Sequence, residues 1–135
     1  NRQRNMELLE RAAEAASCLL RIEQALAPGG TDLSGLLLTF DAGRIWLSLD
    51  AATQEVREKQ VASREQLSQS FEKMDEEEPW WRVLGNPLTR VRDLKVGAGK
   101  GVALQFRTDA DNPRLIAILP GEGGLRVQFQ GAPEK

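Results

Sequence analysis

The sequence contains no histidine and no tyrosine, and Cys18 is its only cysteine. Without histidine, the chain lacks the commonest general base, the usual partner of serine and cysteine nucleophiles and a principal zinc ligand. One cysteine allows neither an internal disulfide nor a cysteine zinc cluster. We therefore expect a protein that is not an enzyme and that holds no metal or other cofactor.

Long hydrophobic runs are also absent. Runs such as the three leucines at residues 36–38 are far shorter than the about 20 apolar residues that a membrane-spanning helix needs, so no membrane segment is predicted. The lone cysteine favours a reducing compartment, and we expect a cytoplasmic protein. A periplasmic protein without disulfides would have the same composition. Because the chain starts at Asn1, removal of a signal peptide stays open.

What is present predicts one globular domain. The chain has 135 residues, of which 41% are apolar and 28% charged. Its net charge of −2 is unevenly distributed: residues 1–79 carry −6 and residues 80–135 carry +4. The two halves either attract each other within the fold or form a dipolar surface that steers a charged partner.

The first element predicted is a long helix over residues 3–27. Its apolar residues recur at spacings of three and four, which gives one continuous stripe: Leu8, Leu9, Ala12, Ala15, Ala16, Leu19, Ile22 and Leu26. Pro28, Gly29 and Gly30 follow and would end the helix.

A hairpin is predicted over residues 36–49. Apolar and polar residues alternate on both sides of Asp41-Ala42-Gly43, which has the composition of a tight turn. Trp46 lies on the opposite face from Ile45 and Leu47, so it is either covered by another element or exposed as an anchor. Residues 54–60 are predicted as a polar edge strand, with a continuous helix from Asp50 to Glu77 as the alternative.

A second amphipathic helix is predicted over residues 63–77. Ser63 and Gln66 have the spacing of a capping box, and Leu67, Phe71 and Met74 recur at helical spacing. An acidic run over residues 75–78 and a tryptophan-rich turn over residues 79–88 follow.

The last third of the chain changes to a period of two. Strands are predicted at residues 88–96, 102–107, 114–119 and 125–130, joined by short turns as in an antiparallel meander. The predicted fold class is therefore α+β: an antiparallel meander sheet of six or seven strands, packed by the long N-terminal helix and the second amphipathic helix.

Three segments carry a resemblance to a known group of proteins. They are Gly35-Leu-Leu-Leu-Thr-Phe40-Asp41-Ala-Gly43-Arg-Ile45, Asp50-x-x-Thr53, and Pro79-Trp80-Trp81-x-x-Leu84-Gly85-x-Pro87-Leu88. Together they resemble small bacterial domains of the kind found among immunity-type proteins, over about residues 33–130. The resemblance implies a single α+β domain that works by binding another protein, and no catalytic residues are carried over.

The predicted function is that of a non-catalytic protein-binding domain, most simply an immunity- or inhibitor-type protein that neutralises a toxin or effector. The candidate partner-binding residues are two tryptophan anchors, an acidic run and two arginines that share a strand face: Trp46, Trp80, Asp75, Glu76, Glu77, Glu78, Arg90 and Arg92. Arg107, Arg114 and Arg126 could approach the arginine pair from neighbouring strands.

Three alternatives remain open from the sequence. One is a secretion-chaperone-like homodimer that binds an effector segment, which fits the small size and acidic pI. Another is a small enzyme that uses carboxylates, which requires Asp41, Asp50 and Asp109 to converge in one cleft. The third is a nucleic-acid binder, which the negative net charge does not favour.

Overall fold

Strands account for most of the secondary structure. The computed structural model describes residues 7–26, 33–50, 52–62, 71–75, 80–97, 99–107, 114–121 and 124–130. Within these ranges the chain forms one α-helix, one short 3-10 helix and nine strands. In chain order they are α1 (Glu7–Glu14), β1 (Leu19–Leu26), β2 (Leu33–Phe40), β3 (Gly43–Asp50), β4 (Glu55–Val61), β5 (Phe71–Lys73), η2 (Trp80–Arg82), β6 (Leu88–Val96), β7 (Gly99–Phe106), β8 (Arg114–Gly121) and β9 (Gly124–Gln130).

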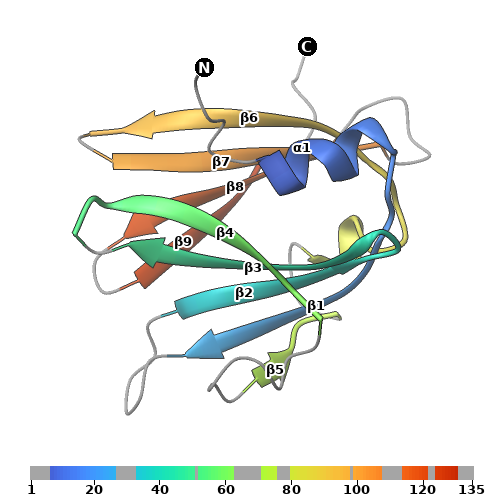
Figure 1. Ribbon diagram of the computed structural model, residues 1–135, viewed down its shortest axis with the longest axis horizontal. Coiled ribbons are helices and arrows are strands. Elements are labelled where there is room, and N and C mark those ends of the chain that lie inside the picture. The colour runs from blue at the N-terminus through green and yellow to red at the C-terminus, as the bar shows by residue number, and fades with distance from the viewer. Residues whose placement is uncertain are drawn as a thin grey trace.

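Six of these strands close into a barrel (Figure 1). Around the ring, β2 pairs with β3, β3 with β4, β4 with β7, β7 with β8, β8 with β9, and β9 returns to β2. Two of the joins are narrow: the parallel β4–β7 pairing at Glu55 and Lys100, and the antiparallel β2–β9 pairing at Leu33 and Leu125. β1 and β5 extend the sheet beside β2, and β6 pairs with β7.

The main core fills the barrel. Alternate residues of each strand point inward, and the helix α1, which lies between the β6–β7 pair and the β3–β4 pair in Figure 1, adds Leu9 and Ala12. The largest inward side chains are less than 2% exposed and include Trp80, Phe106, Leu38, Leu47 and Leu104. Burial of this apolar surface is the dominant favourable contribution to folding.

A second, smaller cluster forms on the other face of β1, β2 and β3. It contains Ala25, Leu37, Trp46 and Val61, with the partly buried Phe71 packed against it. The rings of Trp46 and Phe71 meet edge to face, with centroids 5.8 Å apart and planes at 83°. Strand β5, which carries Phe71, pairs with β1 and so holds this ring in place.

The prediction of a helix over residues 3–27 is wrong, because α1 ends at Glu14 and β1 begins at Leu19; residues 3–6 and 27 lie outside the described ranges. Ala16 has a φ of 51°, and the amides of Ala16 and Ser17 bond back to the carbonyls of Ala13 and Ala12. This pair of bonds is the Schellman motif, which ends a helix, here with alanine at the left-handed position that glycine usually takes.

The irregular pairing of β1 with β2 explains why the apolar residues of this segment have the spacing of a helix. The pairing of β1 with β2 shifts register between Leu19 and Arg21, and again between Ala25 and Leu26. Such an irregularity adds a residue to one strand, so side chains three apart can face the same way. Leu19 and Ile22 are both fully buried at this spacing. The same spacing is that of a helix face.

The second predicted helix, over residues 63–77, is also wrong where the structure describes it. Phe71–Lys73 is strand β5, and Met74 and Asp75 continue without helical structure. Residues 63–70 and 76–79 lie outside the described ranges. Residues 54–60, predicted as a strand with a helix as the alternative, fall almost wholly in strand β4, in which Val56 is buried.

The α+β fold class is therefore corrected to a nearly all-β barrel with one short helix. The sheet has nine strands among the described residues rather than six or seven, and the β4–β7 pairing makes it mixed rather than purely antiparallel. The β2–β3 hairpin and the antiparallel run from β6 to β9 lie where the alternation of side chains predicts strands.

Candidate functional site: an arginine-bordered groove

Two arginines in β6 define the candidate site. Arg90 and Arg92 are two residues apart in one strand, so they project from the same face of the sheet. The β6–β7 register sets Gln105 opposite Arg90 and Ala103 opposite Arg92. Each of these pairs continues as a row into the next strand, β8, where Leu115 lies beside Gln105 and Ala117 beside Ala103.

These rows form a shallow groove of about 170 Å³ on the outside of the barrel. The neighbours of these residues in β7 and β8 point inward, since Leu104, Ile116 and Ile118 are fully buried. The groove exists because two alanines lie between longer side chains, which border it. The residues that line it are Arg90, Arg92, Leu94, Ala103, Gln105, Leu115 and Ala117.

The electrostatics of the groove are positive. No acidic residue is among the described residues that line it. Arg11 pairs with Glu7, and Arg57 pairs with Asp50 and Glu55, all away from the groove. Both Arg90 and Arg92 are exposed, so their guanidinium groups are available for carboxylates or phosphates, which they bind in a bidentate manner.

One of the three further arginines of the sequence prediction joins this face. Arg126 pairs with Leu119, two residues beyond Ala117 in β8, and is exposed. Arg114 lies opposite Phe106, whose side chain is fully buried, so Arg114 lies on the face of β8 that is directed into the barrel. Arg107 follows the last residue of β7 and donates its backbone amide to the Pro87 carbonyl.

The tryptophans singled out by the sequence are not on the surface. Trp46 is 7% exposed and Trp80 is 2% exposed, each within an apolar cluster. Trp81 is the exposed member of the adjacent pair, at 50%. Trp46 and Trp80 therefore contribute to packing in this structure, and neither lies in the groove.

The acidic run is described only at its first residue. Asp75 is partly buried, and its Oδ1 accepts a hydrogen bond from the backbone amide of Ile22 at 2.9 Å. This bond ties the end of β5 to β1. Glu76, Glu77 and Glu78 lie outside the described ranges.

Five residues of the groove were missed by sequence reasoning: Leu94 in β6, which shares the face of Arg90 and Arg92, and the four residues Ala103, Gln105, Leu115 and Ala117 of β7 and β8. The alternation of side chains along a strand could have identified the residues of β7 and β8, because they alternate with the core residues and so must face outward. This alternation does not reveal that the two small residues, Ala103 and Ala117, lie side by side. That juxtaposition depends on the β7–β8 register.

The chemistry available in the groove is binding. Its described lining consists of arginine, leucine, alanine and glutamine, none of which serves as a nucleophile or general base at neutral pH. The carboxylates of the enzyme alternative are spread out: Asp41 precedes β3 and contacts Ser17, whereas Asp50 ends β3 and contacts Arg57. Asp109 lies outside the described ranges.

No group of three or more potential metal ligands occurs among the described residues, and no helix within them has the length and hydropathy needed to cross a membrane. Comparison of the chain with models of protein families, with curated proteins and with solved structures found no match.

Proposed function

We propose that this chain is a non-catalytic protein-binding domain that holds an acidic surface of its partner in the arginine-bordered groove. The observation that carries the proposal is the pairing of Arg90 and Arg92 over an apolar floor, with no carboxylate among the described lining residues. Apolar contact surrounded by arginine is the composition of many interface hot spots.

A protein partner fits the groove better than a nucleic acid does. The described lining contains no aromatic side chain on which a base could stack. The chain as a whole carries a charge of −2, which repels a polyanion over the rest of the surface. A folded protein that presents a local acidic patch avoids that repulsion.

Within this class we infer an immunity- or inhibitor-type role, in which the domain neutralises a toxin or effector in the cytoplasm. The support is the resemblance of residues 35–45, 50–53 and 79–88 to immunity-type domains. The free thiol of Cys18 is in keeping with a reducing compartment.

The test is retention of a partner from lysate of the source organism by immobilised domain. The comparison is between the wild-type protein, the double variant Arg90→Glu/Arg92→Glu, and the charge-matched control Arg21→Glu/Lys59→Glu, whose exposed cations lie on β1 and β4. We expect one protein to bind wild type and control alike, at low salt more strongly than at high salt.

The groove variant should then bind that protein at least about tenfold more weakly, the change that about 1.4 kcal/mol of lost interaction produces. Equal loss in both double variants would show a nonspecific charge effect and refute the groove. Retention of nucleic acid in place of a protein would refute the protein-binding role.

A further inference from the structure

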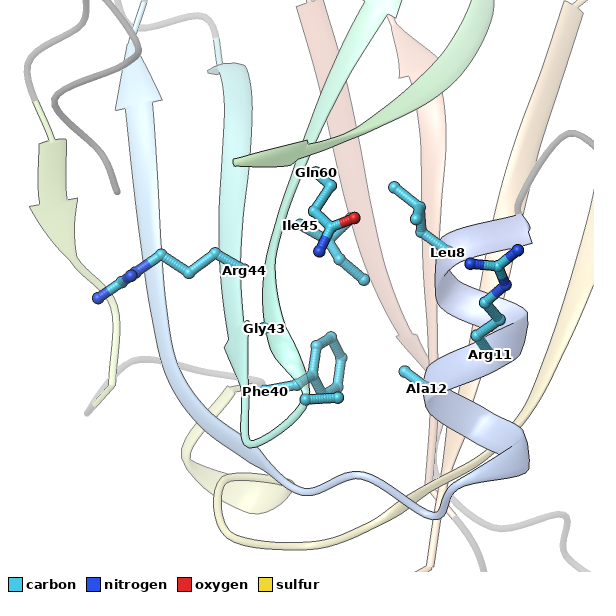
Figure 2. Close-up of a pocket in the computed structure, with 9 residues that line it drawn as sticks. Leu8, Arg11, Ala12, Phe40, Gly43, Arg44, Ile45 and Gln60 are labelled. Atoms are coloured by element: carbon cyan, nitrogen blue, oxygen red, sulfur yellow. The ribbon is translucent and has the colours of Figure 1, made fainter. Parts of the chain in front are cut away.

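A second hollow lies on another side of the molecule, between α1 and the β2–β3 hairpin. It has a volume of about 210 Å³ and is about half enclosed. Figure 2 shows its two walls: Leu8 and Ala12 extend from α1, and Phe40 and Ile45 face them from the hairpin. Gln60, from β4, borders the space between these walls.

The hollow is held open because α1 is fixed at both ends. At its start, the backbone amides of Leu8 and Leu9 donate to the carboxylate of Glu58 in β4, with 3.0 Å for Leu9. Just past its end, the hydroxyl of Ser17 donates to Asp41 and accepts the amide of Ala42 at 3.1 Å. These bonds hold α1 at its distance from the hairpin, so the site is largely preorganised.

The space itself results from small residues on both walls. Ala12 on α1 and Gly43 at the start of β3 both line the hollow. A Cβ built on Gly43 would have only the Gln60 Nε2 nearby, at 3.8 Å. At roughly 30 Å³ per water molecule, the volume equals about seven waters, which limits a ligand to one ring or a short branched chain.

The polar groups at the hollow define the charge of that ligand. Arg11 and Gln60 are among its lining residues, with the guanidinium of Arg11 lying over α1 in Figure 2, and no acidic residue is among its described lining. Arg11 pairs with Glu7 at 2.8 Å, but this exposed i,i+4 pair uses one of five N–H donors and is weak. Arg44 contributes differently: its guanidinium points away from the hollow in Figure 2 and donates to the Ala62 carbonyl.

We propose that this hollow binds a small carboxylate with a compact apolar body. The ring or branched chain packs between Leu8, Ala12, Phe40 and Ile45, and the carboxylate lies at the mouth, where Gln60 donates a hydrogen bond and Arg11 turns from Glu7 to donate another. The site is separate from the arginine-bordered groove, and the proposal does not rest on the function assigned to that groove.

The experiment is an NMR titration of the whole chain, observing methyl groups, with three probes of matched shape. Phenylacetate carries the carboxylate, 2-phenylethanol is neutral, and 2-phenylethylamine is a cation. We expect phenylacetate to bind saturably with a Kd of about 1 mM or lower, with the largest shifts at the Leu8 and Ile45 methyls. The alcohol should bind at least about fivefold more weakly, and the amine should not bind.

Variants locate the binding. Arg11→Gln and Gln60→Ala change exposed side chains and should each weaken phenylacetate binding about threefold or more, whereas the exposed Arg21→Gln should have no effect. Ala12→Leu fills the hollow and should abolish binding; if this buried substitution prevents folding, the two surface variants decide alone. Absence of saturable shifts, equal binding of all three probes, or unchanged affinity in both surface variants would overturn the proposal.

Discussion

At the scale of single residues, close packing explains why particular side chains occur where they do. Gly35 lies in β2 opposite Ser48, next to the cluster around Trp46. A Cβ added at Gly35 would overlap the ring of Trp46 and lie 2.9 Å from the carbonyl oxygen of Leu47. The large ring and the missing side chain are therefore complementary, and each makes the other necessary.

We predict that Gly35→Ala lowers the free energy of unfolding by about 2 kcal/mol, the typical cost of overpacking a filled site. In a Trp46→Leu background the same substitution should cost about 1 kcal/mol or less, because the ring that it displaces is gone. Urea unfolding of the four proteins of this cycle measures the coupling. An equal cost in both backgrounds would mean that the strain comes from the Leu47 carbonyl oxygen and not from the Trp46 ring, and would contradict the prediction.

At the scale of elements, the attachment of α1 to β4 depends on one carboxylate. Burial raises the pKa of Glu58 above its ordinary value of 4.5, and the negative charges of Glu10 and Glu7 raise it further. The hydrogen bonds from the Leu8 and Leu9 amides act in the opposite direction. The folded protein thus holds a proton on Glu58 at a pH where the unfolded chain has lost it.

This raised pKa has a defined effect on stability. The contribution of Glu58 is fully present below pH 4.5 and decreases as the pH rises through the raised pKa of the folded state. Glu58→Gln should lower the free energy of unfolding by about 1 kcal/mol at pH 5, because an amide offers one acceptor oxygen where a carboxyl group has two.

The difference between wild type and Glu58→Gln should then narrow as the pH rises toward 7.5, since only the wild type must ionise a buried group. Urea unfolding at several pH values measures it. Glu14→Gln, an exposed change on the same helix, serves as the control. Its free energy of unfolding should differ from that of wild type by the same amount at every pH. A difference that widens with pH would contradict the assignment.

How far the sequence predicts each element depends on whether the side-chain period is regular. Phe40 and Leu38 in β2, and Leu104 and Phe106 in β7, alternate cleanly, and strands were predicted around both pairs. In β1 the register shifts replace the period of two by a spacing of three, so the same rule predicts a helix.

The candidate site, too, is predicted from the sequence only in part. The shared face of Arg90 and Arg92 follows from local spacing alone, so the sequence predicts it. The burial of Trp46 does not follow from local spacing. The ring that packs against it belongs to Phe71, which lies far along the chain in a strand that pairs with β1. Exposure depends on which segments meet, and local patterns carry no information about that.

At the scale of the whole molecule, the barrel is closed where β9 meets β2. Gly124 lies at this join, and a Cβ added there would collide with the carbonyl oxygen of Leu33, the residue that pairs with Leu125. The colliding atom belongs to the backbone, so a change of rotamer gives no relief. The join therefore requires glycine for its close approach.

We predict that Gly124→Ala lowers the free energy of unfolding by about 2–3 kcal/mol, within the range for substitutions that strain a packed backbone. Gly121→Ala, in the same hairpin, is the control, because its nearest atom would be 3.3 Å away and its cost should stay below about 1 kcal/mol. Hydrogen exchange of β2 and β9 amides should show whether the loss is confined to the join. Equal costs at both glycines would contradict this view of closure.

The Leu33–Leu125 join also bears on how the protein is made. During synthesis, at about 5–20 residues per second, β2 must wait roughly 5–20 seconds for β9 to be translated. The β1–β4 segment can pair locally in that time, but the face destined for the barrel interior stays in water. We expect the nascent chain to rely on chaperones during this interval, and refolding from denaturant to be slow because its decisive contact is so distant along the chain.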